Sequence, residues 1–446
     1  MITLNLVYDN WIEGEIKPVA NCCNIYGPNT FWDPYDLIKH YLDKGLAYQF
    51  LEQVVEEHEK FQVKRCKMNE IQERPDEKFY YVINHYSIEL HRLFQTETPH
   101  GETNQALIDK KRPLSDEVIR LLKENDKFFV MFMTEHECDT EKGFKLMVEY
   151  IQSIGVDLKK LYIVNNNAKL DWLKKIYGDH QVNEHGLEFI PSSSTMVLNK
   201  LGSNYKRDKE GKFFLCHNKS PKTHRYAVLC LLKKYGILDD VNWSLVPSWY
   251  GYPIDDFYFP LFDRYMIEVL DDEIQYFNNI KMKTSDYEGE EGWFHPFSDI
   301  DKSLLPHWQQ VPEKHKTFEE SYVNIVTESL YTNSPNVVQI TEKSFRPFFY
   351  YQLPIIFASP HHVSIMKNRY GFDFFEDIID HNYDDKLDDK QRFFDTMREV
   401  KRLHQNKDKV IEFYHNNYDR LEANKQKVLE ILKIKRDYIF FSNLGR

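Results

Sequence analysis

The chain has 446 residues, with 58 lysines and arginines against 70 aspartates and glutamates, so its net charge is −12. This length predicts two to three domains, and the acidic balance does not favour non-specific binding to nucleic acid or anionic membranes. Only 16 glycines occur, and none are spaced as G-x-G. The absence of that spacing excludes a Rossmann dinucleotide fingerprint and a Walker A loop, and with them most dehydrogenases and P-loop NTPases.

The six cysteines form no C-x-x-C pair, so we expect free thiols in a reducing compartment. The first residues, MITLNLVYDNW, do not have the pattern of a signal peptide, and no apolar run approaches the roughly 18 residues of a membrane span. We therefore expect a cytoplasmic protein with no membrane partner.

The first half of the chain alternates short apolar runs with amphipathic stretches, which is typical of an α/β fold. We expect strands over 2–8, 79–84, 128–133, 161–164 and 187–190. Helical patterns lie between them over 35–60, 115–124, 141–154 and 169–177. Ser115 is the expected N-cap of the second helix, and Gly155 is where the third should stop.

A stretch rich in Ser, Asn, Lys and Gly follows, and within it residues 201–211 are the expected linker between a domain over 1–200 and a domain over 212–446. In the second half we expect strands over 212–216, 243–246, 322–326, 337–340 and 354–357, and helices over 223–235 and 345–351. Residues 250–315 break the pattern and indicate an insertion. From residue 386 to about 433 the chain predicts a polar, helical tail with a long charged helix.

Two α/β units of similar size joined by a linker predict two facing Rossmann-like domains. Ligands of such sheets bind at the carboxyl ends of the strands, so the site is expected in the cleft between the domains.

Residues 322–357 contain the most informative pattern. An apolar run ends at Glu328, and after a short loop the letters Q-I-T-E-K lead into an aromatic-rich helix. Thr341 is the expected N-cap, which places Glu342 and Lys343 beside free backbone N–H groups. Such a terminus and a lysine attract phosphate, and a carboxylate accepts hydrogen bonds from ribose hydroxyls. The pattern indicates a nucleotide site; simple helix capping by Thr and Glu is the alternative.

The run I-T-E-K, followed by an aromatic-rich helix and an apolar strand, resembles the donor-binding motif of the α1,3-fucosyltransferases. In that family a Glu-Asn-Ser-like segment precedes Y-I-T-E-K; here T-E-S stands at 327–329, and Gln339 replaces the tyrosine. By resemblance, Glu342 would hold the ribose and Lys343 the diphosphate of a nucleotide sugar, with Glu328 near the sugar or its leaving phosphate.

The longer run T-E-K-S-F-R-P is also similar to viral and bacterial glycosyltransferase-like proteins that read T-E-K-[TS]-F-[KR]-P. The resemblance implies a glycosyltransferase of the GT-B type, with two Rossmann-like domains, that uses a nucleoside diphosphate sugar and inverts the anomeric carbon. Because Gln339 departs from the pattern, the donor is left open between GDP- and UDP-linked sugars.

A second cluster of charge lies over 212–232, where an apolar run ends at Cys216 and a loop with several cations precedes a helix. Cations at a helix N-terminus oppose its dipole, so a bound diphosphate would explain them. In glycosyltransferases with two Rossmann-like domains, the first strand–loop–helix of the second domain supplies an Arg or Lys to the donor phosphates. By this resemblance Lys219 and Arg225 are the candidates, and Arg225 is preferred because its planar fork can hold two phosphate oxygens. The alternative is a solvated loop.

The acceptor side is expected in the first domain, where an apolar run over 128–133 leads into Thr134, Glu135, His136 and Glu137. A carboxylate or imidazole there can serve as general base. We rank Glu135 first and His85, at the end of another strand, second, with Glu137 also a candidate. Polar residues that merely mark where strands leave the sheet are the alternative.

Two patterns typical of metal sites are set aside. Asp299 and Asp301 form a D-x-D in an irregular acidic segment, and adjacent His361 and His362 rarely converge on one ion. We therefore expect a metal-independent transferase that needs no cofactor besides its donor. Two rivals remain: a phage-type DNA base glycosyltransferase, with basic groups at 62–74 and 206–212 on phosphate, and a non-catalytic nucleotide-binding module.

Overall fold

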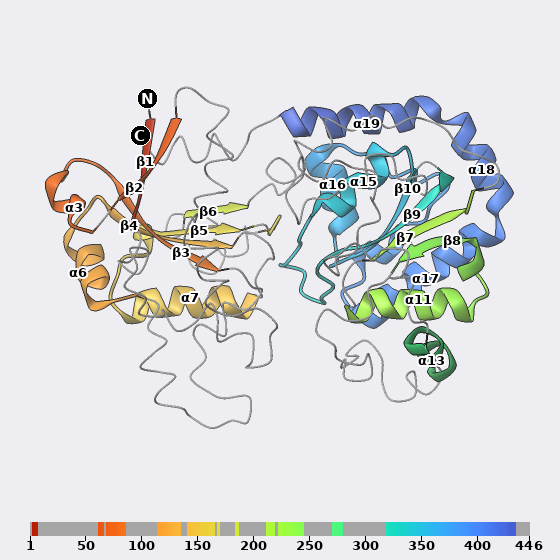
Figure 1. Ribbon diagram of the computed structural model, residues 1–446, viewed down its shortest axis with the longest axis horizontal. Coiled ribbons are helices and arrows are strands. Elements are labelled where there is room, and N and C mark those ends of the chain that lie inside the picture. The colour runs from red at the N-terminus through yellow and green to blue at the C-terminus, as the bar shows by residue number, and fades with distance from the viewer. Residues whose placement is uncertain are drawn as a thin grey trace, which may run out of the picture. The chain divides into compact units, whose positions relative to one another are not determined.

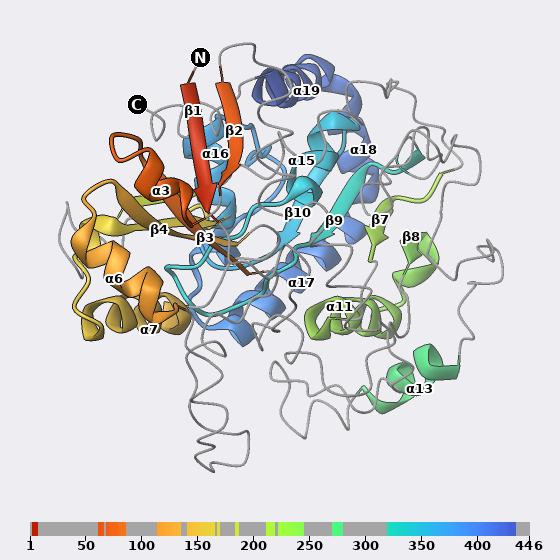
Figure 2. The same ribbon diagram turned by 60° about the vertical axis from the view of Figure 1, so that its left-hand side comes forward.

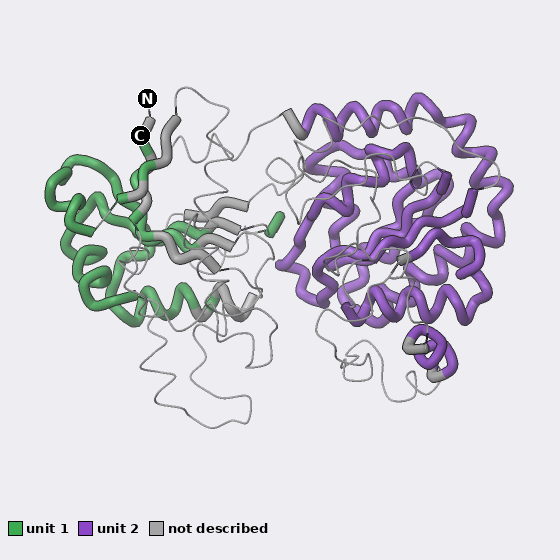
Figure 3. Tube along the Cα trace, viewed as in Figure 1, with its two compact units in different colours: residues 1–192, 435–446 green, residues 193–434 purple. Residues whose placement is uncertain are grey.

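The computed structural model describes residues 2–7, 61–66, 68–85, 114–134, 141–165, 167–169, 183–186, 211–218, 222–244, 270–279, 318 and 320–433. The chain divides into two compact units, unit 1 with residues 1–192 and 435–446 and unit 2 with residues 193–434 (Figure 3). Each is a parallel sheet with helices, which confirms the predicted mixed α/β class. Within the described ranges, no helix has the length and apolar character needed to cross a membrane.

Unit 1 contains a six-stranded sheet in the order β2-β1-β3-β4-β5-β6, and every paired neighbour is parallel. Its strands are β1 (Ile2–Val7), β2 (Phe61–Cys66), β3 (Phe79–His85), β4 (Phe128–Thr134), β5 (Leu161–Asn165) and β6 (Asn183–Gly186). Four of the five expected strands are confirmed within a residue or two. The fifth, expected over 187–190, lies outside the described residues.

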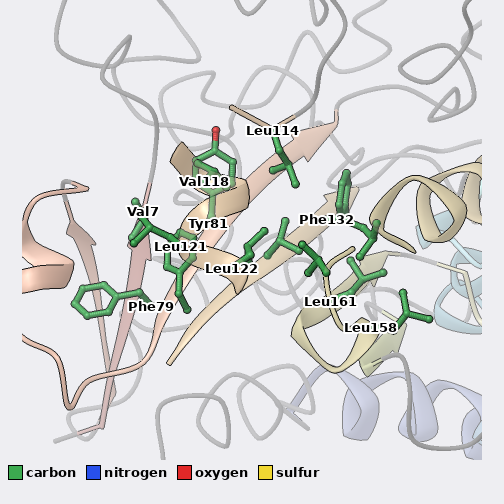
Figure 4. Packing of buried hydrophobic residues seen from close by; sticks show 14 of the residues in the cluster. Val7, Phe79, Tyr81, Leu114, Val118, Leu121, Leu122, Phe132, Leu158 and Leu161 are labelled. Atoms are coloured by element: carbon green, nitrogen blue, oxygen red, sulfur yellow. The ribbon is translucent and has the colours of Figure 1, made fainter. Parts of the chain in front are cut away.

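The core of unit 1 forms where α6 (Asp116–Glu124) and α7 (Glu141–Ser153) meet one face of the sheet. Val118, Leu121 and Leu122 of α6 pack with alternate residues of β3 and β4, such as Phe79 and Phe132 (Figure 4). This alternation is the period of a strand, and the spacing on α6 is the period of a helix, so both apolar faces meet.

Local capping in unit 1 follows the prediction. Ser115 is the N-cap of α6, and its hydroxyl accepts a hydrogen bond from the backbone N of Val118 at 3.3 Å. Gly155, at φ +71°, follows the turn that ends α7. A left-handed backbone there is easy for glycine and costly for other residues, which is why the helix stops at this point.

Unit 2 contains a four-stranded parallel sheet in the order β10-β9-β7-β8. The strands are β7 (Phe214–His217), β8 (Val241–Ser244), β9 (Val323–Thr327) and β10 (Leu353–Phe357). Every residue of β9 and β10 is buried, as expected for strands covered on both faces. In both views, α15 (Glu342–Phe349) and α19 (Tyr418–Lys433) lie on one side of this sheet. Helices α11 (Thr223–Lys234) and α17 (Asp389–Gln405) lie on the other (Figures 1 and 2).

In the described part of unit 2 the α-helices are α11 (Thr223–Lys234), α13 (Asp271–Asn279), α15 (Glu342–Phe349), α16 (His362–Tyr370), α17 (Asp389–Gln405), α18 (Lys407–Asn416) and α19 (Tyr418–Lys433). The expected helical tail is therefore three helices, separated at Asn406 and Asn417. Each asparagine leaves the helical backbone conformation, and asparagine is a common residue at helix ends.

The strand expected over 337–340 is wrong. Val337 to Ile340 are buried, but apart from an isolated bridge at Gln339 they form an irregular segment that leads into α15. Val337, Val338 and Ile340 are apolar and pack into the core, and sequence periodicity cannot separate that from strand pairing in so short a run. The strand expected over 243–246 begins two residues earlier, at Val241. Most of the predicted linker and insertion lies outside the described residues.

The first turn of α16 is capped by a residue distant in sequence. His361 precedes the helix in a left-handed conformation at φ +66° and makes no capping bond through its side chain. Instead, the buried Asp384 carboxylate accepts hydrogen bonds from the backbone N of Val363 at 3.0 Å and Ser364 at 2.9 Å. The carboxylate also suits the positive end of the helix dipole.

Asp384→Ala is expected to lower the free energy of unfolding by about 1–3 kcal/mol, because two buried N–H donors lose their acceptor. Asp384→Asn, which keeps one acceptor oxygen, should cost less. Urea unfolding measures both, with Asp385→Ala as control because that neighbour is largely exposed. Equal losses in Asp384→Ala and the control would contradict the capping role.

Candidate functional site

The strand order of unit 2 indicates where a ligand would bind to its sheet. β8 is added on one side of β7, and the chain then crosses to the other side of β7 to add β9 and β10. Ligands of open parallel sheets bind at the carboxyl ends of the strands where the order reverses. In unit 2 that point is the carboxyl ends of β7 and β9, where Asn218 and Thr327 hydrogen bond to each other.

Glu328, directly after β9, is the centre of the polar network at this edge, and it has no exposed surface. One carboxylate oxygen accepts hydrogen bonds from the backbone N of Thr341 at 3.1 Å and the Ser344 hydroxyl at 2.5 Å. The other accepts from the Thr341 hydroxyl at 2.7 Å and the backbone N of Ser329 at 2.9 Å. Both oxygens are therefore engaged within the protein.

Burial by itself would raise the pKa of the Glu328 carboxyl. Nearby Lys343, and the hydroxyls of Ser344 and Thr341, favour the charged form strongly enough to hold the pKa of Glu328 below its usual value. The carboxylate is thus ionised at neutral pH, and it orders the start of α15 around itself.

Thr341 is the N-cap of α15, as the sequence predicts: its hydroxyl accepts from the backbone N of Lys343 at 3.4 Å. The amino group of Lys343 lies 3.1 Å from the Ser329 hydroxyl, 3.3 Å from that of Thr341 and 3.1 Å from the Glu342 carboxylate. The side chains of Lys343 and Glu342 are 25 % and 18 % exposed, so solvent reaches both.

Glu342 also accepts from Arg346, at 3.1 Å, one turn along the helix. Burial alone would raise the pKa of the Glu342 carboxyl, but Lys343 and Arg346 lower it to about 2. A second lysine reaches the same loop from α11: the amino group of Lys222 donates to the backbone O of Ser329 at 2.7 Å. Lys222 and Lys343 therefore both bind Ser329, one at its carbonyl and one at its hydroxyl.

Arg225 is buried rather than presented to solvent. Its guanidinium donates to the backbone O of Glu328 at 3.2 Å and of Thr327 at 3.4 Å, while His224 donates from Nε2 to the same Glu328 oxygen at 2.8 Å. These contacts fasten the first turn of α11 to the end of β9. Arg225 therefore supports the site from the protein interior by binding backbone carbonyls. Lys222, at the N-cap of α11, is the cation from this helix that keeps contact with solvent.

The β9–α15 loop is also held at Tyr331. Its ring stacks on the His224 imidazole, with centroids 5.4 Å apart, and the Arg392 guanidinium lies 4.6 Å from the ring centre. Arg392 further donates to the backbone O of Thr332 at 2.6 Å. The loop that carries Ser329 is therefore fixed to both α11 and α17.

The structure brings together four predicted residues: Glu328, Thr341, Glu342 and Lys343. Arg225 lies beneath them, and His85 ends β3, which pairs with β1 at the corresponding reversal of strand order in unit 1. Lys219, Glu135 and Glu137, together with the set-aside pair Asp299 and Asp301, lie outside the described residues.

His361 and His362 do not converge on one site. His361 lies 3.4 Å from Asp385, whereas the buried His362 contacts the Ser344 hydroxyl at 2.8 Å. In the described ranges, no group of three or more His, Cys, Asp or Glu side chains has the geometry to hold a metal ion. Sequence reasoning did not assign roles to Ser344, Ser329 or His362; the only signal was their proximity to T-E-K and to strand ends.

This edge combines a helix N-terminus, two lysines and a partly exposed carboxylate. Such a set can bind an anion and accept hydrogen bonds from neighbouring hydroxyls. Comparison with family models, with curated proteins and with solved structures returns no match to the chain. The case for a function therefore rests on this geometry and on the short sequence motif.

Protonation of His362 is expected to make the folded state of unit 2 less stable in acid. Burial lowers the pKa of His362 to about 4, whereas an unfolded histidine titrates near 6.5. Between these values the unfolded chain binds a proton that the folded chain does not, so the free energy of unfolding falls as pH falls, by about 3 kcal/mol for this residue. The lowered pKa of His224, caused by burial and then Arg225, acts in the same direction.

Denaturant unfolding at pH 7, 5.5 and 4.5 measures this loss. His362→Gln should unfold with a shallower pH dependence than the wild type, because glutamine does not titrate. Parallel pH profiles for the two proteins would contradict the assignment of a neutral, buried His362.

Proposed function

We propose that the chain is a glycosyltransferase with two Rossmann-like domains facing an inter-domain cleft. It would transfer a sugar from a nucleoside diphosphate sugar, UDP- or GDP-linked, to an acceptor hydroxyl without a metal. Unit 2 would hold the donor and unit 1 the acceptor. The proposal is supported by the T-E-K motif and by the geometry at the carboxyl edge of unit 2.

The observation that carries the proposal is the meeting of Lys222 and Lys343 at Ser329, beside the N-terminus of α15. When a sugar leaves a nucleoside diphosphate, negative charge grows on the departing phosphate. Fixed cations and backbone N–H groups lower the energy of that charge without having to reorganise. Glu342, partly exposed in the same turn, is suited to the ribose hydroxyls.

The reaction also needs a base that takes the proton of the acceptor hydroxyl. In unit 2, Glu328 is saturated with hydrogen bonds and Glu342 is paired with Lys343 and Arg346, so neither is suited to this task. The proposal therefore places the base in unit 1, at Glu135, with His85 and Glu137 as the other candidates.

A non-catalytic nucleotide-binding module is the second candidate. It is favoured by the same observation that both described carboxylates of the unit 2 site are engaged. A module of this kind would bind nucleoside diphosphates to saturation but would neither transfer nor hydrolyse the sugar. Product release from UDP-glucose, GDP-fucose and related donors, with and without simple sugar acceptors, distinguishes the two.

Lys343→Ala is expected to weaken binding of UDP or GDP to the full chain by about 10- to 100-fold, because a charge-assisted contact to phosphate is lost. Lys222→Ala should weaken it in the same direction. Titration calorimetry measures both. Lys233→Ala is the matched control: this lysine is also partly buried but lies over Tyr276 at the other end of α11.

An unchanged affinity in Lys343→Ala, or an equal loss of affinity in Lys233→Ala, would contradict the assignment of a phosphate site to this edge. Lys343→Arg should restore binding only in part, because a longer planar group replaces a compact charge.

Glu135→Gln is expected to leave donor affinity unchanged and to reduce turnover by about 10²–10⁴-fold, because glutamine keeps the shape but cannot take a proton. Initial rates with saturating donor test this. Near-normal turnover would mean that Glu135 is not the general base. His85 and Glu137 would then be tested in the same way, each by substitution with glutamine.

A further inference from the structure

Three buried side chains from different elements form a continuous hydrogen-bonded relay beneath the Lys343 site. His362, at the start of α16, contacts the Ser344 hydroxyl of α15 through Nε2 at 2.8 Å. Ser344 in turn lies 2.5 Å from the Glu328 carboxylate at the end of β9. None of the three is more than 1 % exposed.

The chemistry of these groups determines where the protons lie. An ionised carboxylate only accepts hydrogen bonds, so the single Ser344 proton points to Glu328. The Ser344 oxygen can then only accept from His362, which requires the proton on Nε2 and leaves Nδ1 as an acceptor. Among the described residues, no group forms a hydrogen bond with that Nδ1, so a second proton on the ring would gain no acceptor.

This proton order supports the first turn of α15. The Glu328 carboxylate accepts hydrogen bonds from the backbone N and the hydroxyl of Thr341, the N-cap. The Thr341 hydroxyl in turn accepts a hydrogen bond from the amino group of Lys343. If His362 no longer donates to Ser344, the serine hydroxyl is free to rotate away from the carboxylate. A buried charge then loses a donor, and the cap that it holds loosens.

We infer that His362 is a positioning residue for the phosphate-binding turn: through Ser344 and Glu328 it fixes the N-cap of α15 and hence the place of Lys343. The inference rests on the proposed function for the role of Lys343. Glutamine can present an amide N–H close to the place of Nε2, whereas leucine has similar bulk and no donor.

The test uses the full chain and compares His362→Leu with His362→Gln. Hydrogen exchange of peptides that cover 341–346 should be about 10-fold faster in His362→Leu and close to wild type in His362→Gln. The affinity for UDP or GDP should fall about 10-fold in the leucine variant and recover to within about threefold in the glutamine variant. Peptides of α17 should exchange as in the wild type.

His381→Leu is the matched control, because His381 is also a buried histidine of unit 2 but binds Tyr383 and the backbone O of Phe374. It should lower stability without selective exchange at 341–346. Equal effects of His381→Leu and His362→Leu at this turn, or a failure of His362→Gln to restore it, would overturn the inference.

Ser344→Ala covers the case in which His362→Leu does not fold. Removing the bridging hydroxyl disconnects His362, so Ser344→Ala should by itself speed exchange at 341–346. His362→Asn, whose shorter side chain carries no donor at the place of Nε2, should also speed it alone but should add nothing to Ser344→Ala; additive effects would overturn the relay. If the wild type binds neither UDP nor GDP, the proposed function fails, while the exchange results still decide whether His362 positions the turn.

Discussion

A carboxylate without solvent must be surrounded by donors, and the carboxyl edge of unit 2 is arranged around that requirement at Glu328. Its four hydrogen bonds reach the residues on both sides of the β9–α15 loop. Because three of the four donors belong to Thr341 and Ser344, in the cap and first turn of α15, satisfying the charge also sets the geometry of the helix start. Lys343 and Glu342 are placed by this arrangement, although neither touches the Glu328 carboxylate.

The surface of the site has a different physical character from its base. At the base of the site, the buried His224 and Arg225 bind backbone carbonyls at the end of β9. At its surface, Lys222, Lys343 and Glu342 keep contact with solvent. A ligand phosphate would therefore meet groups that are already held in place, which limits the ordering cost of binding.

Much of this edge could be predicted from sequence because its signals are local. The Thr341 cap, the first-turn positions of Glu342 and Lys343, and the strand that ends before Glu328 all follow from short-range rules of helix and strand formation. The burial of Arg225 could not be predicted in this way. An arginine in a polar loop reads as exposed, and only the approach of β9, about a hundred residues later, supplies the carbonyls that bind it.

The same limit applies elsewhere in the chain. β2 and β6 were not expected, because F-Q-V-K-R-C and N-E-H-G read as a half-polar run and a turn; both are edge strands, which need no continuous apolar pattern. The three-residue relay of Glu328, Ser344 and His362 joins three elements, so no regular spacing along the chain predicts it. The roles proposed for Glu135 and Glu137 stay predictions from sequence.

The contact between Lys222 and Ser329 joins residues 107 positions apart, and this separation has a consequence for the order of folding. Contacts that close so long a loop form late, after the entropy of the intervening chain has been overcome. During synthesis, β7, β8 and α11 emerge well before β9 and α15. A nascent chain that stops short of α15 holds Lys222 but not Lys343. Under the proposed function, a nucleotide would therefore stabilise unit 2 only after α15 has been made.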